Sequence, residues 1–203
     1  MFDVLIIGGG VSGMSCALVL GSAWKKAFAA DKKIGIIAHQ KTSSLQEALF
    51  NNAYGIPAGK LGSELLTEST QQLAQLYPHI QQIADEKVMA VEGEFPNFTV
   101  ITNKNAYQAK SIVLAIGYSN TFAIDGLMDY IETHRKAVPE KQRIQLKNTD
   151  HKVADGIYVA GTLAGHRSQL AIAAGSGAAV ATDILTLWNN GIDSQSHDSI
   201  KKN

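Results

Sequence analysis

Cysteine is nearly absent from this 203-residue sequence, and net charge is absent altogether. The single cysteine, Cys16, excludes an internal disulfide, a redox dithiol and a metal cage built from several thiolates. Eighteen basic and 18 acidic residues balance to zero at pH 7. Such a chain has no broad basic field to hold a phosphate backbone, so we expect no nucleic-acid partner. The histidines are scattered without ligand spacing, which predicts no metal site.

Long apolar runs are missing as well. The longest uncharged apolar stretch has about a dozen residues, whereas a membrane-spanning helix needs roughly 20. No basic segment precedes the first apolar stretch, so no signal peptide is expected. Apolar residues make up 45% of the chain and charged residues 18%, which is typical of a folded domain. We therefore expect a soluble, cytoplasmic protein without a membrane partner, of a length that suits one domain.

Glycine, by contrast, is frequent, and three glycines directly follow the first apolar run. Residues 3–7 are almost wholly apolar, as expected of a strand buried on both faces of a parallel sheet. A helical pattern over 12–28 and a second apolar run over 33–38 complete a strand–helix–strand unit with a right-handed crossover. The helix residues expected to face the sheet are Met14, Ala17, Leu18 and Trp24.

The spacing Gly8-x-Gly10-x-x-Gly13 lies between the first strand and the helix. In this context the first glycine permits a tight turn, the second lets the backbone approach a pyrophosphate, and the third lets helix and strand pack closely. Amides at the helix start, helped by the helix dipole, then face the anion. A dinucleotide site is therefore predicted here, the alternative being a glycine-rich turn without a ligand.

The acidic residue that usually follows this pattern is missing. It should end the second strand, about 20 residues on, and bind the ribose hydroxyls. That strand ends in Ala38, His39 and Gln40, and Asp31 lies before the strand, at its wrong end. His39 or Gln40 is the candidate replacement as a hydrogen-bonding group, and a loop residue without a ligand role is the alternative.

The rest of the chain adds strands and two further helices. Ser63 is a plausible cap for the first of these helices, and a turn near Pro96 joins two neighbouring strands. The expected helices cover 62–76 and 168–188, and the expected strands cover 87–91, 98–102, 111–115 and 156–161.

With these pieces in order, the chain resembles the flavin domain of the thioredoxin-reductase-like pyridine nucleotide–disulfide oxidoreductases. Residues 8–17 match the family's FAD pyrophosphate fingerprint, and 52–57 resemble its Asn-x-x-Gly loop beside the flavin. Residues 111–117 are similar to its strand ending in Ala-Thr-Gly. Most specific are residues 156–177, which resemble the strand leading to the ribityl chain and the helix whose N-terminus points at the flavin pyrimidine ring. Reduced flavin carries negative charge near that edge, which a helix N-terminus favours.

The departures from that family are as informative as the match. Only 43 residues separate Gly117 from Gly161, too few for the family's inserted NADPH domain. The redox Cys-x-x-Cys of that domain is absent too, and Cys16 is expected to be a buried structural thiol. Thr162 stands where the family has the aspartate that binds the ribityl chain, and Ile116 replaces the threonine of Ala-Thr-Gly.

The resemblance implies an α/β fold: a Rossmann-type FAD-binding domain over 1–190 with a mostly parallel central sheet and a small antiparallel β meander, followed by a polar tail over 191–203. His166 and Arg167 would lie near the flavin ring, where a cation raises its reduction potential; solvated loop residues are the alternative. The residues expected to contact FAD are Gly8, Gly10, Val11, Ser12, Gly13, Ala38, His39, Gln40, Leu45, Asn52, Val88, Ala115, Gly117, Gly161, Thr162, Ser168, Gln169 and Leu170.

The function expected is that of a stand-alone flavoprotein, an FAD-dependent oxidoreductase that uses an external electron donor and is not a dithiol reductase. The alternative is a non-catalytic FAD-binding or regulatory module derived from such an enzyme. A pyridine dinucleotide in the Gly8 fingerprint is a third possibility, against which the flavin-type segment 156–177 argues. No catalytic residue is predicted, and the partners expected are FAD, an unidentified donor or acceptor, and a second copy in a homodimer that covers exposed apolar area.

Overall fold

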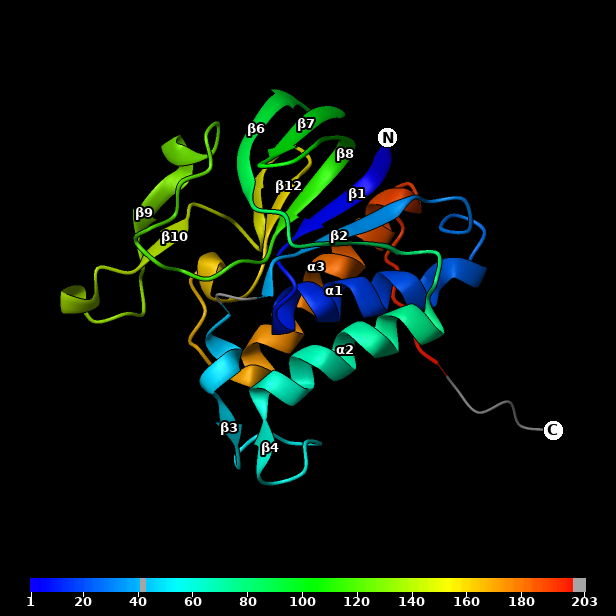
Figure 1. Cartoon of the computed structure of the whole chain (residues 1–203). Helices are drawn as coiled ribbons and strands as arrows, with labels where there is room; N and C mark the ends of the chain where they lie inside the picture. Colours follow the sequence, from blue (N-terminus) through cyan, green and yellow to red (C-terminus); the bar gives the residue numbers. More distant parts are fainter. Residues whose placement is uncertain (41–42, 199–203) are drawn as a thin grey trace.

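Five parallel strands form the centre of the computed structural model, which describes residues 1–40 and 43–198 (Figure 1). In spatial order they are β12 (Ile157–Val159), β8 (Ala106–Leu114), β1 (Phe2–Ile7), β2 (Ile34–Ala38) and β5 (Gln81–Ala84). The central strand, β1, pairs in parallel with β2 and β8. The predicted α/β fold with a mostly parallel sheet is therefore confirmed.

The sheet is buried on both faces, which explains the unbroken apolar run in β1. Successive side chains of a strand point to opposite faces. Val4 and Ile6 accordingly belong to a core on the helix side, and Leu5 and Ile7 belong to a second core on the other side. A strand that packs against protein on both faces has no place for a polar residue.

Helices cover one face of the sheet in two tiers. α1 (Val11–Ser22) and α3 (Leu170–Trp188) lie directly against the strands, and α2 (Gly62–Leu76) packs below α1 (Figure 1). Small residues let the first two helices approach closely: Ser15 Oγ donates to the Ala174 carbonyl at 2.7 Å. A Cβ placed on Gly177 would lie 1.9 Å from the Ser12 carbonyl oxygen. This close approach brings the starts of α1 and α3 to the same end of the sheet.

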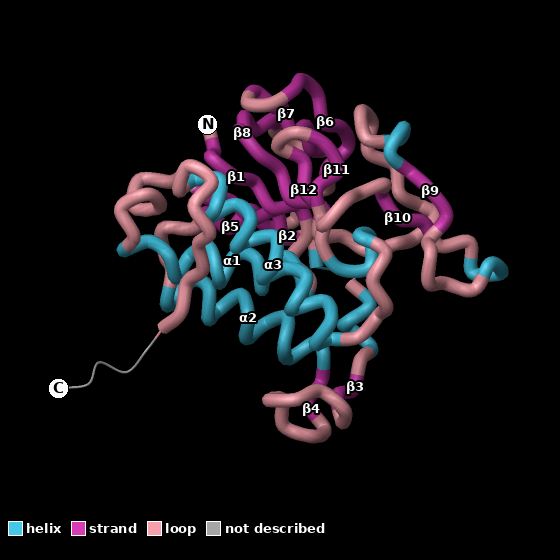
Figure 2. Tube along the Cα trace, turned by 180° about the vertical axis from the view of Figure 1, so that it is seen from behind, coloured by secondary structure: helices cyan, strands magenta, loops and turns pink. Residues whose placement is uncertain are grey.

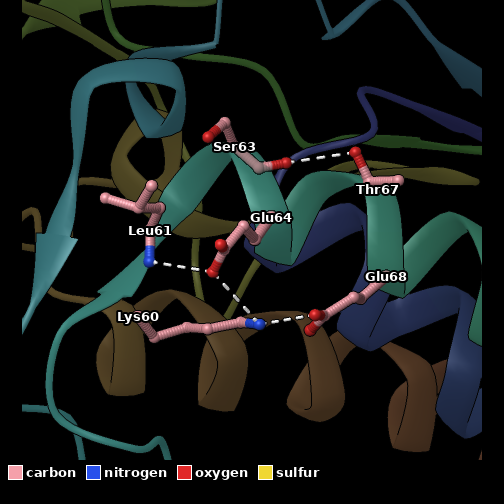
Figure 3. Close-up of polar contacts among 6 residues, drawn as sticks. All are labelled: Lys60, Leu61, Ser63, Glu64, Thr67 and Glu68. Atoms are coloured by element: carbon pink, nitrogen blue, oxygen red, sulfur yellow. Dashed lines mark hydrogen bonds and ion pairs between the residues drawn. The ribbon is translucent and has the colours of Figure 1, made fainter.

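The start of α2 differs from the predicted cap. The helix begins at Gly62 as expected, but the capping residue is Leu61, and Ser63 lies inside the first turn, where it caps nothing. Glu64 accepts a hydrogen bond from the Leu61 amide at 3.4 Å and pairs with Lys60, which also bonds Glu68 (Figure 3). Acidic side chains in the first turn of a helix complement its dipole. Lys60 comes from a short arm of two strands, β3 (Leu49–Phe50) and β4 (Lys60–Leu61).

An antiparallel meander extends the sheet, as predicted. It consists of β6 (Val88–Glu94), β7 (Asn97–Thr102) and β8. Glu86, buried at its base, accepts hydrogen bonds from Thr102 Oγ1 at 2.5 Å, Asn105 Nδ2 at 2.7 Å and Tyr107 Oη at 2.8 Å. These three hydrogen bonds lower the pKa of the Glu86 carboxyl, and the bond from Thr102 makes the largest contribution. The ionised carboxylate therefore holds the turn between β7 and β8.

The segment between β8 and β12 forms a small hairpin beside the sheet instead of a second domain. Its strands are β9 (Ile131–Thr133) and β10 (Ile144–Leu146), which pair antiparallel. Both views place this hairpin to one side of the sheet, away from the three helices (Figures 1 and 2). The chain then returns through β11 (Lys152–Ala154), which pairs antiparallel with β12 at the sheet edge.

Two helix boundaries differ from the sequence-based expectation by two residues or more, and one strand of the parallel sheet was not expected. α1 ends at Ser22 instead of continuing to 28, because the Ser22 hydroxyl bonds back to the Val19 carbonyl at 2.8 Å and the chain enters a 3₁₀ turn. Trp24 falls in that turn and is 48% exposed, so its prediction as a sheet-facing residue is wrong. β5 was not predicted, since only Ile83 of its four residues is buried and apolar. α3 begins at Leu170, two residues later than expected, with Gln169 as its cap.

α3 is, within the described part of the chain, the one helix long and apolar enough to cross a membrane by length and composition alone. The sequence-based limit of about a dozen apolar residues missed it, because the helix contains Ser176, Thr182, Asp183 and Thr186. Helices in the cores of soluble proteins pass the same test, and α3 packs against α1 throughout its buried face.

The expected polar tail lies along the helix layer as far as the structure describes it. Ser22 Oγ lies 2.9 Å from Ser196 Oγ, and Tyr77 Oη donates to Asp198 at 3.2 Å. Ser194 is buried and accepts a bond from Asn189. Residues 199–203 of the predicted tail lie outside the described part.

Candidate functional site

A cleft of about 620 Å³ opens at the carboxyl ends of the parallel strands, within the size range of small-molecule sites. Ligands of open α/β sheets bind at this edge. Fifteen residues of the predicted FAD site line the cleft: Gly8, Gly10, Val11, Ser12, His39, Gln40, Leu45, Asn52, Ala115, Gly117, Gly161, Thr162, Ser168, Gln169 and Leu170. The fold thus brings together segments that are up to 160 residues apart in the sequence.

The glycine turn on the cleft floor has room for a ligand at only one of its three positions. A Cβ on Gly8, which has φ +119°, would lie 2.4 Å from the Ala115 carbonyl oxygen, and one on Gly13 would lie 1.9 Å from the Gly8 carbonyl oxygen. A Cβ on Gly10 would meet nothing within 4 Å. Gly8 and Gly13 are therefore needed for packing, whereas Gly10 keeps open the space in front of the α1 amides.

The start of α1 favours an anion. Its first turn carries no acidic side chain, and no side chain caps its amides. The first amides of a helix lack intrahelical acceptors and lie at the positive end of the helix dipole. Val11 and Ser12 line the cleft at this point, so a phosphate there would meet free donors.

The charge of the cleft is also suited to an anion. Among its lining residues in the described chain there is no aspartate or glutamate, and Arg143 is the one lysine or arginine. Arg143 Nε is shielded from solvent without a hydrogen-bond partner, an arrangement that costs about 1–3 kcal/mol. Its guanidinium carbon lies 4.9 Å from the centre of the Tyr118 ring. An orphaned buried donor in an acid-free cleft fits a negatively charged ligand.

The end of β2 separates the two candidates for the missing ribose contact. Gln40 Nε2 donates to the Gly9 carbonyl at 2.9 Å and approaches Thr70 Oγ1 at 3.4 Å, so it braces the glycine turn. His39 lines the cleft, and its Nδ1 is shielded and has no hydrogen-bond partner. His39 is therefore the residue that retains a ring nitrogen for a ligand hydroxyl.

The hairpin beside the sheet holds the loop that follows β12. Lys136 N–H donates to His134 Nδ1 at 3.1 Å, so Nδ1 is an acceptor and the ring hydrogen lies on Nε2. That Nε2 donates to the Thr162 carbonyl at 3.1 Å. Arg135 Nη2 donates to the Ala164 carbonyl at 2.6 Å. The cleft residue Thr162 and its neighbour Ala164 are thus fixed from the segment that stands in place of a second domain.

The comparisons with known proteins agree with this geometry. A family model described as "pyridine nucleotide-disulphide oxidoreductase" matches residues 2–162, which is most of the chain. The chain belongs to this family. No curated protein sequence matches it.

Solved structures of the same fold include thioredoxin reductases. The chain superimposes on a thioredoxin reductase from Gloeobacter violaceus with a TM-score of 0.72 and 15% identity, covering 98% of this chain and 99% of that chain. An oxidoreductase from Agrobacterium tumefaciens superimposes with a TM-score of 0.71 and 15% identity, covering 92% of this chain and 98% of that chain. A ferredoxin-flavin thioredoxin reductase from Clostridium acetobutylicum superimposes with a TM-score of 0.66 and 18% identity, covering 93% of this chain and 98% of that chain. At these identities the likeness is one of fold, the flavin oxidoreductase type.

Three predicted site residues lie outside the cleft lining. Gly13 is buried in the contact between α1 and the glycine turn, and Ala38 packs beneath Gly9. Val88 opens β6 and is buried in the core on the meander side. Gly13 and Ala38 thus support the glycine turn from behind.

Several lining residues were not predicted from the sequence. Ser43, Ser44, Leu49 and Phe50 lie in the stretch before the Asn52 loop, and polar loop residues carried no pattern that could have selected them. Tyr118 and Arg143 belong to the segment between Gly117 and Gly161, for which no site residue was predicted. A lone arginine there carried no sequence signal, because its approach to the cleft depends on the hairpin.

His166 and Arg167 do not line the cleft, but His166 belongs to a partly buried polar cluster that reaches the cleft residue Gly161. His151 Nε2 lies 3.0 Å from His166 Nε2 and 3.0 Å from Ser176 Oγ. Ser176 Oγ in turn accepts a hydrogen bond from the Gly161 amide at 2.8 Å. The two facing ring nitrogens have room for one hydrogen between them, so the pair holds the cleft loop while it is not fully protonated. Arg167 is exposed.

This histidine pair predicts a loss of stability in mild acid. Burial lowers the pKa of both rings, and the charges of Lys136 and Arg135 lower that of His166 further. Unfolded histidine has a pKa of about 6.5, so below that pH the unfolded chain binds more protons than the folded one. We expect the free energy of unfolding in urea to fall between pH 7.5 and 5.5, and to fall less in His166→Gln. Equal pH slopes for both proteins would contradict the assignment.

Proposed function

We propose that the chain binds FAD in this cleft and acts as a flavin-dependent oxidoreductase that takes electrons from an external donor. The observation that carries the proposal is that two helix N-termini open into one acid-free cleft. Residues 10–12 of α1 line it at one end, and residues 168–170 before and at the start of α3 line it at the other. FAD has a pyrophosphate and, when reduced, a negatively charged pyrimidine edge, which suit these two positions.

The residues present fit such a ligand along its length. Gly10 leaves room for the pyrophosphate before the free amides of Val11 and Ser12. His39 offers its unpartnered Nδ1 to the ribose, and Thr162 lines the cleft where the ribityl chain would pass. Bound FAD would supply the capacity to accept and donate electrons. The protein's part is to orient the flavin and to exclude water from the strand ends.

The donor is external on this proposal because the chain has no nicotinamide site of the family type. Residues 118–160 contain no second Gly-x-Gly-x-x-Gly and form the β9–β10 hairpin and β11. The one cysteine, Cys16, is fully buried in α1, and burial raises the pKa of its thiol. A buried thiol with a raised pKa is a poor nucleophile, so dithiol reduction is not proposed.

The experiment is a visible spectrum of the freshly purified protein, followed by chromatography of the ligand that heat releases. We expect a yellow protein that releases FAD in an equimolar amount. NADPH alone should bleach it without saturation, since no nicotinamide site is present, while a chemical reductant should bleach it completely and a quinone should reoxidise it. A colourless protein that takes up no added FAD would contradict the proposal.

A second candidate is a non-catalytic FAD-binding or regulatory module. It is favoured by the two replacements beside the flavin, Ile116 and Thr162, of which the latter removes a carboxylate. The same spectra distinguish the candidates. A protein that binds FAD but is neither reduced by added donors nor reoxidised with turnover by oxygen or a quinone would be such a module.

A further inference from the structure

We propose that Arg143 binds the pyrophosphate of the dinucleotide, supplying a charge contact from the segment that replaces the family's second domain. This inference rests on the proposed FAD binding, and it adds a residue that neither the glycine fingerprint nor the family resemblance points to. Its starting observation is the orphaned Nε of a guanidinium that lines an otherwise uncharged cleft.

The backbone fixes Arg143 beside the segment that leaves the glycine turn after β8. β8 ends against that turn, since the Ala115 carbonyl touches Gly8, and the next residues lead to Tyr118. The Tyr118 carbonyl accepts the Ile144 amide at 3.2 Å, and the Arg143 carbonyl accepts the His134 amide at 2.9 Å. Arg143 is therefore held between β9 and the segment that follows β8, and it lines the same cleft as the start of α1.

Within the described residues, the Arg143 side chain contacts the Tyr118 ring but has no ion-pair partner. No ion pair of Arg143 occurs in the described part of the chain, and no acidic residue there lines the cleft. The guanidinium lies 4.9 Å from the Tyr118 ring, whose edge-on neighbour is His134, with ring centres 5.2 Å apart. An aromatic face positions a guanidinium while leaving its planar donor fork free.

A pyrophosphate matches these donors better than a single carboxylate does. It carries two negative charges, whereas the start of α1 provides the equivalent of only about half a positive charge. A guanidinium binds phosphate oxygens in a bidentate way, and Arg143 is the cation available among the described lining residues. The helix dipole and the guanidinium would thus share one ligand group from two sides.

The test compares Arg143→Gln and Arg143→Lys with a matched control, Lys141→Gln. Lys141 is exposed and lies two residues away on the same hairpin, and its replacement by glutamine removes one positive charge, as Arg143→Gln does. Dissociation constants are measured by titration with FAD, with ADP, which has the pyrophosphate without the flavin, and with riboflavin, which has the flavin without phosphate. Thermal unfolding is measured with and without FAD.

We expect Arg143→Gln to weaken FAD and ADP by about 10- to 100-fold and to leave riboflavin binding unchanged. Arg143→Lys should recover part of the loss, because it restores the charge but not the fork. Without ligand, Arg143→Gln should unfold no earlier than the wild type, since it removes an orphaned buried donor. Lys141→Gln should bind all three ligands as the wild type does.

The outcomes separate this inference from the proposed function. Wild-type protein that binds no FAD would overturn the proposed function, and ADP binding would still test the arginine. If the wild type binds FAD and Arg143→Gln binds it equally well, the arginine assignment alone fails, and a substrate anion becomes its partner. Equal weakening of FAD and riboflavin would also overturn the assignment, because Arg143 would then act on the flavin ring or on the fold.

Discussion

Gly10→Ala is expected to bind FAD about 10- to 100-fold more weakly than the wild type, a loss of about 1.4–2.8 kcal/mol, while folding normally. The added Cβ meets no protein atom within 4 Å, and Gly10 has φ −80° and ψ −171°, which alanine adopts without strain. As the capping residue of α1, alanine costs no more than about 1 kcal/mol of stability. The methyl group instead occupies the space through which a pyrophosphate approaches the amides. Flavin titration and urea unfolding on the same preparations measure the two quantities.

Gly13→Ala is the matched comparison. We expect it to lower stability directly and FAD affinity only as a consequence, whereas Gly10→Ala should lower FAD affinity directly. The Cβ added in Gly13→Ala would lie 1.9 Å from the Gly8 carbonyl oxygen, a contact with backbone that cannot be relieved by a side-chain rotation. Overpacking of this kind costs about 1–3 kcal/mol, so this variant should lose stability first and FAD binding as a consequence. If Gly10→Ala keeps wild-type affinity, or loses as much stability as Gly13→Ala, the open space before α1 is not a ligand cradle.

Much of the fold could be predicted because each local pattern had one physical explanation. An apolar run such as residues 3–7 with no polar position requires cover on both faces, and the two cores provide it. β5 was not predicted, because an edge strand with one buried apolar residue shows no alternation of apolar and polar residues. α1 ended early for a local reason, the Ser22 hydroxyl bond, that competes with an otherwise continuous helical pattern.

Candidate site residues could be predicted where a local backbone turn is required, as in the glycine turn. They could not be predicted where distant segments bring a side chain to the cleft. Gly8, Gly10 and Gly13 are informative because their spacing occurs between a buried strand and a helix, where a pyrophosphate site needs it. Between His39 and Gln40 the sequence left the choice open. In the structure Gln40 donates to the Gly9 carbonyl, 31 residues away in the sequence, which favours His39 as the proposed ribose contact. Arg143 reaches the cleft only because the hairpin folds back on β8, which no local pattern in residues 118–155 indicates.

His134→Ala should have the second large effect, because this buried residue joins the hairpin to the cleft. Its side chain is 3% exposed, donates to the Thr162 carbonyl and accepts the Lys136 amide. Removing it leaves both backbone groups without their partner and creates a cavity, so we expect a loss of about 2–4 kcal/mol in the free energy of unfolding. FAD affinity should fall as well, since residues 161–165 lose one of their supports.

Two variants make this prediction specific to the hydrogen bonds of His134. His134→Gln has both an amide donor and an amide acceptor and should recover part of the stability and of the FAD affinity. Lys136→Ala removes an exposed side chain but keeps the backbone amide that His134 accepts, so it should behave as the wild type. Were His134→Ala no less stable than Lys136→Ala in urea, the hairpin would be an appendage. A loss confined to the histidine variants would mean that the segment replacing the second domain is required for the cleft itself.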